Sequence, residues 1–356
     1  MRASRRHLGG GRRRPYVEYV PVVTSGTADF LESSDRVAGG ASTGAGGPVG
    51  PTEIAARSPW QLFWRRLRED KVAIVALGVV IFLIFVAVFA PLIVKVFHLP
   101  NPTTQDHSAQ DSFGDPTGPS SKHLLGVDPH GSDVLSRVIY GARISLFVAV
   151  VATAISVTIG VVVGLFSGYY RGWVDTALSR TMDVLLAFPI LLLALGIAEA
   201  CSDPKKGCLG GILHPGKGVV IGVIAFANWP YVGRLVRGQV LSLRQREFVE
   251  SARSLGASGP RIMFREILPN LVAPIVVYAS LVIPQNILFE AALSFLGAGV
   301  TDPTPSWGKM IADAADIFDQ AWWFMVFPGI ALLVTVLAFN LVGDGLQDAL
   351  NPRTGR

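Results

Sequence analysis

Four long uncharged stretches constrain the fold of this chain more than any other feature of its sequence. They cover residues 72–94, 144–166, 267–289 and 321–343, and each is 23 residues long. At about 1.5 Å of rise per residue, a helix of this length crosses the roughly 30 Å hydrocarbon core of a bilayer. The whole chain is 50% hydrophobic and 16% charged, which excludes an ordinary soluble enzyme. The sequence therefore predicts an all-α integral membrane protein.

Two weaker apolar stretches, 184–198 and 218–233, complete the set. They reach spanning length when polar neighbours such as Asp183 and Arg234 lie near the membrane interface. With them, the sequence predicts six transmembrane helices. Prolines within or near these helices should kink them, because each removes a backbone hydrogen bond; they are Pro189, Pro230, Pro274, Pro284 and Pro328.

The distribution of arginine predicts the orientation, because short basic loops remain in the cytoplasm. Residues 1–71 carry eleven arginines and one lysine, and residues 234–265 carry seven arginines. If these segments are inside, the loops 95–143, 199–217 and 299–320 are outside, and both termini are cytoplasmic. The net charge of +5 is thus explained by topology, and no basic surface studded with aromatic residues indicates nucleic-acid binding.

The composition divides the chain into four parts. Residues 1–57 are rich in arginine and glycine and poor in apolar residues, which predicts a disordered basic cytoplasmic tail. Residues 58–71 read as an amphipathic helix in the membrane interface, with Ser58 as N-cap and its apolar residues on one face; a straight extension of the first span is the alternative. Residues 72–346 form the six-helix domain, and residues 347–356 form a cytoplasmic C-terminal tail.

The second span carries glycines one helical turn apart, at Gly160, Gly164 and Gly168. Small residues in this spacing let another helix backbone approach closely. The partner helix could belong to this chain or to another subunit.

No catalytic motif is present, and the near matches are weak. The segment "GILHPGKG" (211–218) has the spacing of a phosphate-binding loop, but Gly218 stands where serine or threonine would hold magnesium. Four histidines in the outer segment 95–143 mingle with aspartates, at spacings that favour a solvated loop over a metal site. Cys201 and Cys208, the only cysteines, lie in one outer loop, where a disulfide is favoured over two free thiols or a weak metal clip.

A polar segment, 244–269, separates the fourth and fifth spans. Residues 247–255 are good helix formers, Gly256 is a suitable helix stop, and Pro260 can open a second helix that runs to Pro269. A polar helical hairpin is not needed for spanning. Ala252 and Gly256 are small enough to permit close approach, so we interpret the hairpin as a docking element for a cytoplasmic partner.

This segment resembles the signature of the inner-membrane permeases of binding-protein-dependent ABC importers. That signature is Glu-Ala-Ala, then Gly, then Leu-Pro, and the corresponding residues here are Glu250, Ser251, Ala252, Gly256, Leu268 and Pro269, with Ser251 in place of the first alanine. The segments "LLGVDPHGSDVLSRVIYGARISL", "EAALSFLGAGV", "PTPSWGKMI" and "FNLVGDGLQDALNPR" resemble the dipeptide and oligopeptide branch, in particular its second, C-type permease. The resemblance covers about residues 58–353.

The resemblance implies the type I importer fold, a bacterial plasma membrane location and a set of partners. A homologous second permease would share the pathway, two cytoplasmic ATPase subunits would bind ATP and Mg²⁺, and an extracytoplasmic solute-binding protein would deliver a peptide. The helix at Glu250–Gly256 would be the coupling helix that docks on an ATPase. This chain itself would bind no cofactor or metal and would not be an enzyme.

Glu290 lies near the outer end of the fifth span and is a candidate pathway residue. An ionised carboxylate in hydrocarbon is costly, so we expect it to hydrogen-bond polar groups or face the pathway; a lipid-facing interfacial position is the alternative.

Two other functional classes stay open for the whole chain. The same architecture could import nickel, glutathione or another small solute, or the chain could be a membrane scaffold or sensor without transport activity.

Overall fold

The computed structural model describes residues 59–111, 114–201 and 216–350. They belong to one compact unit, Arg57–Arg356, and the predicted tail 1–57 lies outside them. The helices in chain order are α2 (Pro59–Glu69), α3 (Lys71–Val96), the short η1 (His107–Ala109), α4 (Val134–Tyr169), α5 (Trp173–Ala187), α6 (Ile190–Ala200), α7 (Lys217–Leu243), α8 (Glu247–Ser254), α9 (Gly259–Arg261), the π-helical η3 (Ile262–Ile267), α10 (Leu268–Phe295), α11 (Trp307–Ala315) and α12 (Trp322–Leu350). No strand occurs among these residues, which show only isolated bridges.

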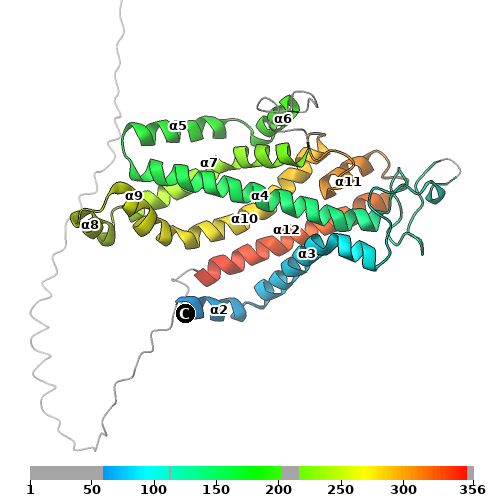
Figure 1. Ribbon diagram of the computed structural model, residues 1–356, viewed down its shortest axis with the longest axis horizontal. Helices are drawn as coiled ribbons and strands as arrows, with labels where there is room; N and C mark the ends of the chain where they lie inside the picture. Colours follow the sequence, from blue (N-terminus) through cyan, green and yellow to red (C-terminus); the bar gives the residue numbers. More distant parts are fainter. Residues whose placement is uncertain (1–58, 112–113, 202–215, 351–356) are drawn as a thin grey trace, which may run out of the picture. The chain divides into compact units, whose positions relative to one another are not determined.

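In the part of the chain that the structure describes, five helices are long and apolar enough to cross a membrane. They are α3, α4, α7, α12 and the continuous helix Gly259–Phe295, which joins α9, η3 and α10; α5 and α6 together make a sixth span if the bent pair is counted as one. Figure 1 shows α3, α12, α10, α4 and α7 running side by side, and neighbouring helices in this series are in contact. The predicted all-α fold with up to six spans is therefore confirmed.

The third predicted span is not one continuous helix. α5 ends at Ala187, α6 begins at Ile190, and their axes differ by 88°. Pro189 explains the break, because its ring disfavours helical backbone at Phe188, which is extended (φ −82°, ψ 140°). The expected kink at Pro189 is thus a sharp corner between two shorter helices.

Other element boundaries also differ from the apolar stretches. α4 begins at Val134, ten residues before the predicted start of its span, because Asp133 caps it by accepting a hydrogen bond from the amide of Ser136. α7 continues to Leu243, ten residues past its predicted end. The predicted outer loop 299–320 contains a helix, α11, which Ser306 caps.

The glycine row of α4 packs against α7 of the same chain. A Cβ atom added to Gly160 would lie 2.5 Å from the Cβ of Val232, and one added to Gly164 would lie 2.7 Å from the carbonyl oxygen of Gly233. Real Cβ atoms do not approach so closely. These glycines therefore set the close α4–α7 contact, and the structure selects internal packing over a subunit contact.

The two ends of the bundle differ in composition. α8 and α9 lie at one end, whereas α11 and the segment 97–133 lie at the other (Figure 1). The hairpin, which carries several arginines, and the segment 97–133, which carries five aspartates, are thus at opposite ends. This matches the expected alternation of the loops, and the orientation in the membrane stays a prediction.

Part of the apolar face of α2 packs against other helices of this chain. Leu67 is buried with Ala73 of α3 and Ala349 of α12, Phe63 packs against them, and Trp64 remains exposed. α2 therefore lies against the ends of two spans, and its predicted position in the membrane interface stays a prediction.

Candidate functional site

The segment 244–269 forms the hairpin that the sequence predicts, with one difference. α8 ends at Ser254, and Gly256 follows in the left-handed region at φ +77°, donating its N–H to the carbonyl of Arg253 at 3.0 Å. Glycine takes this conformation without the steric cost that a Cβ atom brings. Pro260 lies in the first turn of the next helix as predicted, but that helix does not end at Pro269. It continues through a π-helical segment into the fifth span, since proline is compatible with the first turn of α10.

An apolar cluster ties the hairpin to the membrane helices. Val249 of α8 is fully buried, and it shares this cluster with Ile262 and Ile267 of η3 and with residues of three spans. Those span residues are Leu165 of α4, Val232, Val236 and Val240 of α7, and Leu271 of α10. We call this set the hairpin cluster. Through this cluster, α8 is packed together with η3 and with the three spans α4, α7 and α10.

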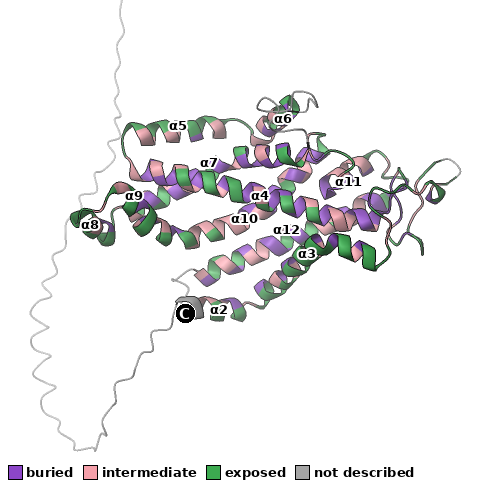
Figure 2. Ribbon diagram, in the orientation of Figure 1, coloured by how far each residue is buried: buried purple, intermediate pink, exposed green. Residues whose placement is uncertain are grey.

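The outer surface of the hairpin is left uncovered. Leu255 is 88% exposed at the tip, and Phe248 and Phe264 are also exposed. Within the described part of the chain, no side chain covers these apolar groups at the tip of a polar hairpin, which is typical of a protein contact surface. Figure 2 shows exposed residues along α8. Sequence reasoning missed Leu255, although an apolar residue next to a helix-stopping glycine in a polar segment was the available signal.

The six signature residues divide into two groups. Glu250, Ser251 and Gly256 are exposed on the hairpin, where they can meet a partner. Ala252 and Leu268 are half-buried and pack on the hairpin cluster, and Pro269 is exposed in the first turn of α10. The structure thus joins the two halves of the signature through one apolar cluster rather than through a single binding pocket. Their predicted docking role stays a prediction.

Glu290 lies inside the bundle and not at its surface. Its side chain is fully buried and accepts hydrogen bonds from the hydroxyls of Ser145 (3.0 Å) on α4 and Ser294 (2.8 Å) on α10. Ser145 also accepts the backbone N–H of Trp307 at 3.3 Å. The carboxylate therefore connects α10 with α4 and, through Ser145, with the start of α11. Contact with a solute would require this region to open, and the pathway role stays a prediction.

The segment 97–133 folds into a cap over the other end of the bundle, which sequence reasoning treated as a solvated loop. Asp128 accepts hydrogen bonds from the amides of His130 and Ser132 and pairs with Arg137 in a buried contact. Gly126, at φ +79°, lies under the ring of Trp323, whose Nε1 donates to the carbonyl of Val127 at 3.2 Å. The motif "LLGVDPHGSD" is therefore a structural element that packs this cap against α4 and α12.

The histidines of this cap do not gather into a metal site. His123 is buried and its Nδ1 lies 3.0 Å from an oxygen of Asp133, whereas His107 contacts Gln110. Where the structure is described, no group of three or more His, Cys, Asp or Glu side chains has metal-binding geometry.

At the cap's surface, the hydrogen bond from Lys122 holds the pKa of the Asp106 carboxyl well below its usual range, and Ser108 adds to the effect.

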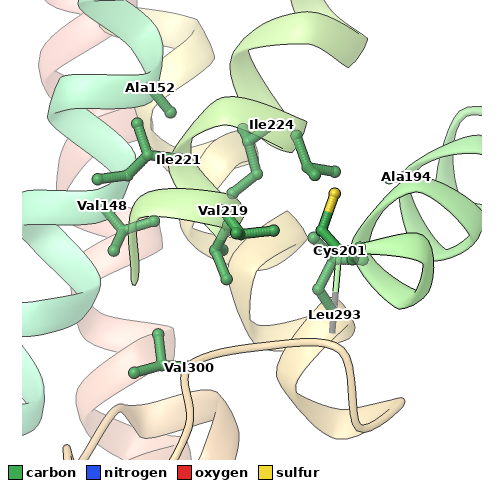
Figure 3. Packing of buried hydrophobic residues seen from close by; sticks show 12 residues of the cluster. Val148, Ala152, Ala194, Cys201, Val219, Ile221, Ile224, Leu293 and Val300 are labelled. Atoms are coloured by element: carbon green, nitrogen blue, oxygen red, sulfur yellow. The ribbon is translucent and has the colours of Figure 1, made fainter. Parts of the chain in front are cut away.

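Cys201 lies at the end of α6 in a buried apolar cluster with Ala194, Val219 and Leu293, as Figure 3 shows. It is 1% exposed and disulfide-bonded. Cys208 lies outside the described residues, as does most of the "GILHPGKG" segment. The pairing of the two cysteines stays a prediction.

Together, the apolar spans, the anchored hairpin and the folded cap define a polytopic membrane protein with separate surfaces at its two ends. A chain from a structure of the MetNI methionine ABC transporter in an inward-facing conformation has a similar fold, with a TM-score of 0.50 at 18% identity over 60% of this chain and 96% of that chain.

Sequence comparison then identifies the family. The family model described as "Binding-protein-dependent transport system inner membrane component" matches residues 160–356, and the "N-terminal TM domain of oligopeptide transport permease C" matches residues 58–116. The dipeptide transport system permease protein DppC of Alkalihalophilus pseudofirmus is 39% identical over 86% of this chain and 94% of its own length. The glutathione transport system permease protein GsiD of Salmonella typhimurium is 45% identical over 86% of this chain and 93% of its own length.

The chain belongs to the family of inner-membrane permeases of binding-protein-dependent ABC importers. It is thus a multi-pass inner-membrane transport protein and not an enzyme, as the sequence predicts.

Proposed function

We propose that this chain is one of two permease subunits of an ATP-driven importer of small peptides. The observation that carries the proposal is the hairpin 244–269, which exposes Leu255 and Gly256 and is anchored by Val249 in the hairpin cluster. A transport permease needs such a rigid lever, because energy released outside the membrane has to reach the helices that line the path.

In the proposed mechanism, two cytoplasmic ATPase subunits bind ATP and Mg²⁺, and one of them receives α8 in a groove. When the ATPases close on ATP, α8 moves with its ATPase. The hairpin cluster passes this motion to α4, α7 and α10, so that the spans turn from an inward-facing to an outward-facing arrangement. The permease chain transmits motion and supplies half of the path, whereas the ATPases hold the nucleotide.

The proposed orientation places the hairpin and both termini in the cytoplasm. The cap formed by segment 97–133 and α11 then faces outward, where a solute-binding protein would deliver the peptide. Buried pairs such as Asp128 with Arg137 and the capping of α4 by Asp133 give this cap a fixed shape. A fixed surface suits repeated docking of a soluble partner, because little ordering is needed on each encounter.

The cargo class is inferred from the relatives. Their names specify a dipeptide and glutathione, and glutathione is itself a small peptide, so both point to cargo with peptide bonds. Glutathione is accordingly the second candidate. Nickel has no comparable support, because the described outer residues form no metal-binding group.

Reconstitution of the complete transporter in proteoliposomes tests the proposal. The purified complex of both permeases and both ATPases, with its binding protein outside and ATP inside, is offered radiolabelled dialanine, radiolabelled glutathione or ⁶³Ni²⁺ in parallel. ATP-dependent accumulation of dialanine is the expected result. Accumulation of glutathione alone would select the second candidate, and ATP-dependent uptake of nickel without either peptide would refute peptide import.

A further inference from the structure

A polar stripe runs along the surface of two spans. On α7 it consists of Asn228, Tyr231 and Arg234, which are three residues apart and therefore share one helical face. On α10 it includes Tyr278 and Gln285, seven residues apart. Tyr231 is 45% exposed, and Gln285 is also exposed. Asn228, Tyr231, Tyr278 and Gln285 lie well inside the spans Lys217–Leu243 and Gly259–Phe295, whereas Arg234 directly follows the apolar stretch 218–233.

The exposed surface of α3 has the opposite character. Its outward residues are apolar, among them Ile81, Phe82, Phe85 and Val88. An apolar surface of this kind is suited to lipid. A surface with amide and phenol groups in a membrane span is not suited to lipid, because each polar group would lose its hydrogen bonds in hydrocarbon. The stripe on α7 and α10 therefore faces an aqueous path or another protein, and α3 faces lipid.

A cavity of about 210 Å³ opens on this stripe, between α6, α7 and α10. Its polar lining consists of Asn228, Tyr231, Tyr278, Gln285 and Asn286, and its apolar lining is made by three further side chains. We call it the amide pocket. Ligand pockets that enclose a small molecule usually measure about 300–1,000 Å³. The amide pocket can therefore cover one side of a ligand and leaves the other side open.

A chain of hydrogen bonds fixes the rear of the pocket. Asn228 Nδ2 donates to Asn286 Oδ1 at 2.9 Å, Asn286 Nδ2 donates to the hydroxyl of Thr153 at 2.8 Å, and Thr153 donates to the carbonyl of Ala149 at 2.7 Å. Asn228 Nδ2 also donates to the carbonyl of Ile224 at 3.1 Å. Both N–H groups of Asn228 are thus engaged, which orients its carbonyl oxygen. A polar group held in this way can bind a ligand without being ordered first.

The other polar groups of the pocket are not held by hydrogen bonds within the described chain. Among the hydrogen bonds of the described chain, none involves the side chain of Tyr231, Tyr278 or Gln285, nor the carbonyl oxygen of Asn228. These groups offer both donors and acceptors toward the opening. None of the residues that line the pocket is acidic or basic. The first charges follow about one turn along α7, where Arg234 pairs with Asp183 at 2.7 Å.

We propose that the amide pocket binds the main chain of the peptide during passage, through hydrogen bonds from Gln285, Tyr231 and Tyr278 to its peptide groups. Neutral amide and phenol groups match the alternating N–H and C=O groups that every peptide shares, whatever its side chains. A pocket without charge would not distinguish acidic from basic peptides. The open side would be closed by the second permease. This inference rests on the proposed peptide import.

Uptake by the complete transporter in proteoliposomes tests the pocket. Gln285→Leu and Tyr231→Phe each remove hydrogen-bonding atoms with little change in volume, and we expect each to raise the KM for dialanine by about 2- to 12-fold, the range of one neutral hydrogen bond. Thr158→Val is the matched control, because Thr158 is an exposed polar residue of α4 whose hydroxyl donates to its own helix at Ala154. The control should keep the KM of the unaltered complex.

Cysteine labelling distinguishes a peptide path from a contact with the partner permease. In a Cys201→Ser, Cys208→Ser background, Gln285→Cys should react with a water-soluble maleimide, and excess dialanine with the binding protein and ATP should slow the reaction several-fold. Phe85→Cys on the lipid-facing surface of α3 should not react.

Each result bears on the proposal. A normal KM in both pocket variants, or labelling of Gln285→Cys that peptide never slows, would overturn the pocket while leaving peptide import intact. Absence of labelling, with disulfide crosslinking to a partner helix instead, would make this surface a subunit contact and likewise overturn it. A transporter of normal sequence that imports no peptide would overturn the pocket together with the proposed function.

Discussion

Gly256→Asp separates folding of the hairpin from its docking. Gly256 has φ +77°, and a side chain in this left-handed region costs about 1–2 kcal/mol, somewhat less for Asp and Asn. A Cβ atom at this position would meet none of the described residues within 4 Å, so no clash with them adds to that cost. Val249 still anchors α8 in the hairpin cluster. We therefore expect the variant to insert in the membrane and to keep its fold.

We expect Gly256→Asp to weaken the binding of the ATPases to the hairpin far more than it weakens the fold. Gly256 is next to Leu255, which is 88% exposed, so a partner that covers Leu255 would also cover a carboxylate at position 256. An unpaired charge buried in an interface costs roughly 3–5 kcal/mol, which corresponds to at least a 100-fold loss of affinity. The predicted outcome is a permease that is present in the membrane at normal levels but no longer retains the ATPases.

Co-purification of the ATPases with a tagged permease, together with dialanine uptake, measures this effect. Gly256→Asn is the matched control, because it has nearly the same size and tolerates the left-handed conformation but carries no charge. It should retain more ATPase than Gly256→Asp. Full retention of the ATPases and undiminished uptake in the Asp variant would refute the docking role of the hairpin tip.

Variants at Gly164, at Glu290 and at the two cysteines test other parts of the fold. Gly164→Ala should destabilise the protein by about 1–3 kcal/mol because the added methyl overpacks the α4–α7 contact, whereas Gly196→Ala, with nothing within 4 Å, should not; thermal unfolding in detergent compares them, and equal unfolding temperatures would contradict the packing argument. Glu290→Gln should reduce peptide uptake more than complex assembly, so normal uptake at normal assembly would argue against a role in transport. Replacing Cys201 and Cys208 together by serine should leave assembly intact, and mass spectrometry of the alkylated, non-reduced protein should show both thiols of the unaltered chain unlabelled; complete alkylation without reduction would disprove their pairing.

The hairpin was predictable because its signals are local. The helix-forming run 247–255, the glycine at 256 and the proline at 260 each restrict their own backbone, and all three appear in the structure at the expected places. α11 could also have been predicted. Ser306 is a good N-cap, and apolar residues follow at helical spacing from Trp307 to Ala314. The polarity of a segment between two spans does not by itself reveal such a helix.

The prediction that the second hairpin helix ends at Pro269 was wrong, because the effect of a proline depends on its position in the helix. Pro269 looked like a stop, yet proline in a first turn is compatible with helix, and the backbone continues from Gly259 to Phe295. Whether a proline ends a helix or begins its next part depends on what the following residues pack against. Leu271 belongs to the hairpin cluster and Leu268 packs against it, which keeps this stretch helical.

By itself, the sequence determined that this chain is helical, crosses a membrane several times and carries a polar helical hairpin between two spans. Hydrocarbon offers no hydrogen-bond partners, so the backbone N–H and C=O groups of each span must bond within the same helix. The ability to span is therefore a property of about 20 consecutive residues and can be predicted from the local sequence. The tertiary structure alone decided which helix the glycines of α4 contact, that Glu290 is buried, and that Thr153, Asn228 and Asn286 form one hydrogen-bonded chain behind a pocket. These features depend on which faces of distant helices meet, and that pairing is set by the packing of the whole bundle rather than by any local stretch of sequence.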